Sequence, residues 1–309
     1  MSSPDQHNSL LRKLAVVTAL TSLLPIGFGS LVTTLGAGMA FPDWPTSDGQ
    51  GMLSYPWHLS MGDKFVEHGH RLAGMVIGLC SLILFLTAWF TAASRAVRIG
   101  CTLVLAAVVA QGLIGAARVL MDERVMAYAH SVFGCLVFAG LWVVVLMTGK
   151  PVAAAQAGQT PERDSLSGRI LVVLFPVIAI AQYSIGGVVR HFGTWIVLHF
   201  AGAAVVCLTV CAVVVSSRRK ASKAVRYNTL IAVTAVVTQI AIGLMTWATK
   251  FGIPETGLVA VQDSIPQIVV RSLHTVAGMV VVASAVAWSI RVQSGISSRA
   301  CPSGQVAVQ

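Results

Sequence analysis

Charged residues are scarce in this 309-residue sequence: only 10% are Asp, Glu, Lys or Arg, whereas 56% are hydrophobic. A soluble domain carries about 25% charged residues, so this composition excludes an ordinary water-soluble globular protein. Acidic residues are fewer than basic residues, 11 against 21. The sequence therefore predicts a chain whose surroundings are mostly lipid.

Cysteines are also few, and their positions exclude a disulfide framework. None of the six falls in a segment expected to face the outside of the membrane, and none shows the spacing of a metal-thiolate site. We interpret them as small apolar packing residues. Five lie in long apolar segments and one in the C-terminal tail: Cys80, Cys101, Cys135, Cys207, Cys211 and Cys301.

Eight apolar segments are long enough to cross a bilayer, which takes about 20 residues each. The first is too long for a signal peptide and has no cleavage site, so we expect it to remain. The sequence thus predicts an all-α membrane protein of eight transmembrane helices. The predicted spans are 14–36, 68–92, 97–118, 126–148, 168–190, 194–215, 227–249 and 268–290.

The net charge of +10 does not indicate a nucleic-acid partner, because the basic residues cluster at one side of the predicted spans. Most of them, such as Arg12, Lys150 and Arg218, fall on the side of both termini, whereas most acidic residues fall opposite. This bias follows the positive-inside rule. We therefore expect cytoplasmic N- and C-termini and a multi-pass protein in a bacterial-type plasma (inner) membrane.

Short motifs recur between the two halves of the chain. Gln and Gly are spaced four apart in three spans, and the step from His70 to His199 is 129 residues, close to the 128 from Gln111 to Gln239. We predict two pseudo-repeated four-helix bundles, residues 1–148 and 168–309, joined by a cytoplasmic linker at 149–167. The recurring pairs are Gln111/Gly115, Gln182/Gly186 and Gln239/Gly243.

Four of the eight histidines fall near the outer end of the even-numbered predicted spans, one on each: His70, His130, His199 and His274. Ionisable groups at membrane depth are costly and usually functional. Two imidazoles that face each other in a helical bundle can ligate one haem iron, which accepts axial His. His7, His58 and His191 lie in the tail or outer loops and are expected to be solvated.

Other readings of the four histidines remain. Each could be a buried residue hydrogen-bonded to a neighbouring helix, although four at matched depth make this less favoured. A non-haem iron or copper site is also conceivable, but neither bundle offers a carboxylate to complete a facial set of ligands. Haem is the favoured ligand.

Glu67 breaks the symmetry between the halves. It lies three residues before His70 and on the same helix face, whereas Arg271 occupies the equivalent place before His274. Arg71 and His68 could pair with Glu67 or with a haem propionate. The alternative is a carboxylate favoured at a helix start by the macrodipole.

Taken together, these residues resemble the haem A synthase family over about residues 14–290. The resemblance rests on EHGHR at 67–71, His130, His199, GGVVRH at 186–191, RSLHTVAG at 271–278 and Pro-Asp-Trp-Pro at 42–45. It implies a membrane oxidase of haem A biosynthesis and cytochrome oxidase assembly that converts the C8 methyl of haem O to formyl.

The resemblance also implies site residues and partners. His70 and His130 would ligate the substrate, haem O, with Glu67 in a catalytic role, and His199 and His274 would ligate haem B. Arg71 and Arg190 would contact the haems. A haem O synthase and terminal oxidase subunits are the implied partners. The sequence departs from the family in having Phe41 and Ser47 where many members have cysteines, and Thr33 in place of an arginine.

Two other functions are consistent with parts of the sequence. A di-haem b-type electron-transfer cytochrome would share the four histidines but would not need Glu67. A repeat-built transporter would expect broken helices and polar residues at mid-span. Pro25 and Pro176 could kink their helices, but the recurrent glutamines are the only repeated polar groups there.

Overall fold

The computed structural model describes residues 4–149, 166–217 and 222–297. Within these ranges the chain is helical and contains no strand. The elements are α1 (Pro4–Thr21), α2 (Leu23–Leu35), η1 (Trp57–Leu59), α3 (Gly62–Phe90), α4 (Arg95–Met121), α5 (Arg124–Met147), α6 (Leu166–Phe192), α7 (Ile196–Ser217), α8 (Lys223–Phe251), η3 (Pro254–Thr256) and α9 (Ile265–Ser297).

Eight spans among the described residues are long and apolar enough to cross a membrane, which confirms the predicted class of multi-pass all-α membrane protein. Several helices begin earlier than predicted. α3 begins at Gly62 and not at 68, and α9 begins at Ile265 and not at 268. Their first turns carry polar residues such as Asp63 and Gln267, so apolar content alone does not mark where the helices begin.

The first span is broken into two helices at Ser22. Pro25 has no N–H and cannot donate a hydrogen bond to the carbonyl of Thr21, which favours an interruption here. The Ser22 hydroxyl donates to the Ala19 carbonyl at 2.6 Å, and the Ile26 N–H donates to the Ser22 carbonyl at 3.3 Å. Pro176, by contrast, lies inside a continuous α6.

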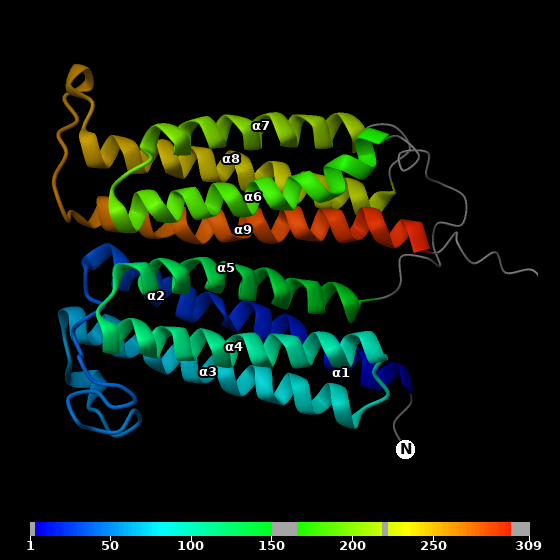
Figure 1. The fold of residues 1–309 in the computed structure, drawn as a ribbon, viewed down its shortest axis with the longest axis horizontal. Helices are drawn as coiled ribbons and strands as arrows, with labels where there is room; N and C mark the ends of the chain where they lie inside the picture. The colour runs from blue at the N-terminus through cyan, green and yellow to red at the C-terminus, as the bar shows by residue number, and fades with distance from the viewer. Residues whose placement is uncertain (1–3, 150–165, 218–221, 298–309) are drawn as a thin grey trace, which may run out of the picture.

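The helices form two groups, with α1–α5 in one and α6–α9 in the other (Figure 1). α9 lies between them and packs against α5 and α2 as well as against α6 and α8. One core cluster joins α1, α3, α4 and α5, and the other joins α5 to α6–α9. The halves therefore share α5 in their packing. The proposed duplication stays a prediction, and residues 150–165 of the predicted linker lie outside the described residues.

The long loop 36–61 and the hairpin 252–264 emerge from the same end of the molecule (Figure 1). α1 begins and α9 ends at the opposite end. This arrangement agrees with an even number of crossings and places the long described loops at one end of the helices. We refer to residues 36–61 as the first outer loop, after the side on which the sequence predicts it.

Candidate functional site

The four histidines singled out by the sequence lie at the end of the molecule that carries the outer loops. Each falls within the first three turns of its helix: His70 in α3, His130 in α5, His199 in α7 and His274 in α9. This common depth follows from the up-and-down topology, because every second helix enters the membrane from the same side.

The imidazoles form two facing pairs, one in each half. The ring centroids of His70 and His130 are 6.0 Å apart, and those of His199 and His274 are 6.2 Å apart. A metal–imidazole bond is about 2.0–2.1 Å long, so two imidazoles that share one metal have centroids roughly 6 Å apart. In both pairs the ring planes are at 80° to each other.

A glycine from the preceding span lies against each imidazole. A Cβ built on Gly29 would lie 2.8 Å from His70 Cε1, and a Cβ on Gly243 would lie 2.9 Å from His274 Cε1. The same contact would be 3.0 Å in the other two helix pairs, Gly115 with His130 and Gly186 with His199. Glycine is therefore the residue that lets each imidazole reach its position.

Both pairs contain buried imidazole nitrogens that no described group satisfies. His130 Nδ1 and His274 Nδ1 are buried and have no hydrogen-bond partner among the described residues. Buried polar atoms are rarely left without a partner, so these nitrogens mark places where a ligand would fit. No cluster of three or more His, Cys, Asp or Glu suited to a metal occurs in the described part of the chain.

A cavity lies beside His199 and His274, and most of its wall is apolar. Its basic wall residues are Arg190, Lys250 and Arg271, which lie toward the outer ends of α6, α8 and α9. Sequence reasoning missed Lys250 and did not assign a role to Arg271. Lys250 and Arg271 both lie at the helix ends opposite the two termini, where the sequence has few basic residues, and this could have indicated a role for them.

Glu67 and Arg71 form a buried ion pair in α3 that faces the first outer loop. The Arg71 Nη2 to Glu67 Oε1 distance is 2.7 Å, and their side chains are 7% and 4% exposed. The backbone N–H of Phe41 donates to Glu67 Oε2 at 3.2 Å. Every described hydrogen bond of the Glu67 carboxylate is thus with Arg71 or the loop, although the sequence predicted that it would point toward the pocket of His70.

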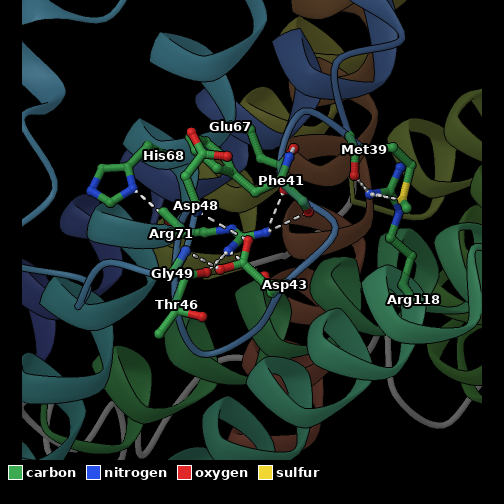
Figure 2. A network of polar contacts seen from close by, with 12 residues as sticks. Met39, Phe41, Asp43, Thr46, Asp48, Gly49, Glu67, His68, Arg71 and Arg118 are labelled. Atoms are coloured by element: carbon green, nitrogen blue, oxygen red, sulfur yellow. Dashed lines mark hydrogen bonds and ion pairs between the residues drawn. The ribbon is translucent and has the colours of Figure 1, made fainter.

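Arg71 fastens the loop by binding three main-chain oxygens. Its guanidinium donates to the carbonyls of Asp43 at 2.9 Å, Thr46 at 2.7 Å and Phe41 at 3.1 Å (Figure 2). Arg118 of α4 reaches the same loop by donating to the Gly38 carbonyl. A contact of Arg71 with a haem propionate stays a prediction, since its described partners are all on the protein.

His68, which the sequence offered as a partner of Glu67 or of a haem propionate, contacts the first outer loop. It is fully buried, and its Nδ1 lies 2.9 Å from Ser47 Oγ while its Nε2 lies 3.1 Å from the Met52 carbonyl. Its ring also packs against Tyr55, with centroids 4.7 Å apart. Ser47 therefore takes part in fixing the first outer loop.

Arg190 connects the two halves of the molecule. Its Nη2 donates to the Ser30 carbonyl at 2.7 Å and to Thr34 Oγ1 at 2.8 Å, and its Nη1 donates to Thr275 Oγ1 of α9. Arg190 also lines the cavity beside His199 and His274. Its predicted contact with a haem stays a prediction. The neighbouring His191 is half-buried, with its ring centroid 6.3 Å from that of Tyr128, and is not solvated as the sequence predicted.

Part of the chain, including most of this site, is similar to known proteins. Residues 60–201 match the family model described as cytochrome oxidase assembly protein. This region contains Glu67, His70 and His130 and ends just after His199, so it includes three of the four histidines.

Two groups of relatives are similar to parts of the chain. It is 31% identical over 156 residues to a protoheme IX farnesyltransferase of Halobacterium salinarum, covering 48% of this chain and 32% of the relative. It is 27% identical over 152 residues to a heme A synthase of Nitrosospira multiformis, covering 46% of this chain and 42% of the relative. The match thus spans less than half the length of each relative.

Proposed function

We propose that this chain, part of which is similar to a heme A synthase and to the cytochrome oxidase assembly protein family, oxidises a side chain of a membrane-bound haem. The substrate would be haem O, and the reaction would convert its C8 methyl to formyl. The single observation that carries this proposal is the presence of two facing imidazole pairs at matched depth, each with the centroid separation that one iron requires.

The residues at both pairs fit a haem. In the C-terminal half, His199 and His274 would hold the iron of haem B, and the basic groups of the cavity wall suit the propionates. In the N-terminal half, His70 and His130 would hold the substrate haem. A bound haem would supply the redox chemistry that side chains lack.

The side chains of the protein would position the haem and would accept a proton or stabilise positive charge during the reaction. The largely apolar wall of the cavity beside His199 and His274 would keep water away from a bound haem, and the histidines would hold its iron. Glu67 lies one turn before His70, where a carboxylate can accept a proton or stabilise positive charge in a dry site. Arg71 and the Phe41 N–H hold the carboxylate in place.

The partner and membrane assignments belong to the same proposal. A haem O synthase would supply the substrate and a terminal oxidase would receive the product. The likeness of part of the chain to a protoheme IX farnesyltransferase supports a place next to haem prenylation. The charge bias of the sequence supports a bacterial-type plasma membrane with both termini in the cytoplasm.

A di-haem electron-transfer cytochrome is the second candidate. The observation that favours it is the orientation of Glu67, whose described contacts are with Arg71 and the loop. In that case Glu67 would be a structural carboxylate, and the protein would carry haem B in both halves without changing it.

One experiment separates the two candidates. The full chain is expressed with a haem O source, purified, and its extracted porphyrins are identified by mass, for the wild type and for Glu67→Gln. An oxidase is expected to contain haem O or its oxidised forms beside haem B, and Glu67→Gln is expected to keep total haem but form at least tenfold less haem A, because the amide cannot take a proton.

The exposed Glu123→Gln at the start of α5 is the matched control, and it should behave as the wild type. Haem B alone in the wild-type protein would contradict the oxidase proposal and favour the cytochrome. Normal haem A formation by Glu67→Gln would remove Glu67 from the chemistry.

A further inference from the structure

Three recurrent glutamines have no role in the proposed chemistry, yet each lies against one of the histidines. Each comes one helical turn before the glycine that faces the imidazole: Gln111 in α4, Gln182 in α6 and Gln239 in α8. Polar side chains inside a membrane protein are costly and usually serve a purpose.

Gln111 and Gln182 each bind the ring and the main chain of a single histidine. Gln111 Nε2 donates to the His130 carbonyl at 2.9 Å and lies 3.2 Å from His130 Nε2. Gln182 Nε2 donates to the His199 carbonyl at 2.9 Å and lies 3.1 Å from His199 Nδ1. An amide NH2 has two hydrogens, so it can engage both atoms and restrict rotation of the imidazole about its side-chain bonds.

Gln239 makes a looser version of the same contact. Its Nε2 lies 3.4 Å from His274 Nε2, without a described bond to the main chain of that histidine. It also fills space beside Gly278, where a Cβ would lie 3.3 Å from Gln239 Nε2. The amide thus packs between α8 and α9 next to the ring.

The first helix pair, α2–α3, contacts its histidine ring with a main-chain atom and not with a glutamine. The residue one turn before Gly29 is Pro25, which has no side-chain donor or acceptor. Its carbonyl oxygen lies 2.9 Å from His70 Nδ1, so the ring N–H can donate to the main chain. This leaves His70 Nε2 directed away from the contact and available to a metal, in the arrangement in which a ligating His donates its other N–H to a carbonyl.

We propose that Gln111, Gln182 and Gln239 are positioning residues that orient the imidazoles of His130, His199 and His274 for haem ligation, and that the Pro25 carbonyl does this for His70. This inference rests on the proposed haem ligation. Outer-sphere partners of this kind fix the ring orientation and tune the basicity of the ligand, and their loss typically lowers metal affinity about 10–100-fold.

The oxygen atom of each glutamine amide supports this role. The Oε1 atoms of all three glutamines are buried and have no partner among the described residues. When a metal occupies one ring nitrogen, the other carries a proton and needs an acceptor. Each amide holds such an acceptor close to the ring. A half-turn about the terminal bond presents Oε1 to the ring N–H, and in Gln111 and Gln182 it exchanges the bond to the histidine carbonyl for this one.

The test uses the purified full chain with three Gln→Met variants, which remove the amide at similar volume. Gln267→Met is the matched control, because Gln267 is buried but lies two turns before His274 in α9 and bonds the Thr249 carbonyl and the Asp263 N–H rather than an imidazole. Haem B titration and low-spin electron paramagnetic resonance are measured for each protein, with the His274→Ala spectrum identifying the C-terminal signal.

We expect Gln182→Met and Gln239→Met to weaken haem binding about 10–100-fold and to shift the g-values of the C-terminal signal only. Gln111→Met should shift the N-terminal signal. Gln267→Met should change neither, although it can lower thermal stability. Gln→Met variants with wild-type affinity and g-values would overturn the inference. A wild-type protein that takes up no haem would instead overturn the proposed function.

Discussion

The helix pair α2–α3 holds its histidine with main-chain atoms, whereas the other three pairs use a glutamine side chain. The difference extends to the glycine that follows each histidine. A Cβ at Gly134, Gly202 or Gly278 would meet a glutamine of the preceding span, but nothing lies within 4 Å of the corresponding position at Gly74. The first pair therefore has a similar ring position with more open space beside it.

The same histidine position thus occurs with two kinds of supporting contact, a side-chain amide or a main-chain carbonyl. A side-chain amide both orients the imidazole and fills the gap between two helices. A main-chain carbonyl orients the imidazole and leaves the gap open. The open side lies beside His70, in the half that we propose to bind the substrate.

The largest expected effect comes from substituting the glycines. Alanine at Gly202 places a Cβ against Gln182 Oε1, which forces the glutamine away from His199, so we expect loss of the C-terminal haem. Gly74→Ala meets no atom within 4 Å and should keep both haems. The haem-to-protein ratio from pyridine haemochrome spectra measures both outcomes. Loss of haem in Gly74→Ala would show that the first pair is as tightly packed as the others.

A second contrast separates the outer loops of the two halves. The first outer loop is fastened by buried charged groups, whereas the hairpin 252–264 carries largely exposed apolar residues such as Val259 and Val261. Its described side-chain anchor is Gln267, which accepts from the Asp263 N–H and donates to the Thr249 carbonyl. The first outer loop is thus the more rigidly held of the two.

Arg71→Met is expected to have a large effect on stability because it leaves the Glu67 charge buried without its partner. Removing one member of a buried ion pair costs about 3–5 kcal/mol. Adding Glu67→Gln should recover part of this loss, since no charge then remains. Denaturant unfolding in detergent measures these differences. Arg124→Met, at an exposed site, is the control and should stay within about 0.5 kcal/mol of the wild type.

Much of the scaffold was readable from the sequence, because a bilayer imposes span length and alternation on the chain. The eight spans and the placement of one histidine on every second helix follow from apolar runs and loop charges alone. The Gln–Gly spacing was also visible, but its meaning was not, because a four-residue step does not say which neighbouring helix the residues face.

The contacts of the first outer loop could not be predicted. Helical spacing places Glu67 near both His70 and Arg71, and only the position of the Phe41 N–H, 26 residues earlier in the chain, decides which way the carboxylate turns. The burial of His68 depends in the same way on Ser47 and Met52. Long-range loop packing of this kind leaves no periodic signal in the sequence.

The smallest expected effect concerns Asp43, which closes a turn in the first outer loop. The hydrogen bond from the Thr46 side chain, followed by those from the N–H groups of Gly49 and Asp48, lowers the pKa of Asp43 from 3.8 to about 2. A carboxyl whose pKa is lower in the folded state stabilises the fold above pH 3.8, and this contribution disappears as the pH falls toward 2. Because the group is partly exposed, the effect should be confined to the turn.

Hydrogen exchange at the amides of Asp48 and Gly49 measures this local effect. In the wild type their protection should fall between pH 4 and pH 2, relative to an unstructured peptide at the same pH, because the protonated carboxyl accepts hydrogen bonds less strongly. In Asp43→Asn the protection should be several-fold lower at pH 7 and nearly independent of pH, since the amide has no charge to lose. Equal protection in both proteins at neutral pH would mean that Arg71, through its bonds to the Asp43 and Thr46 carbonyls, holds the turn without help from the carboxylate.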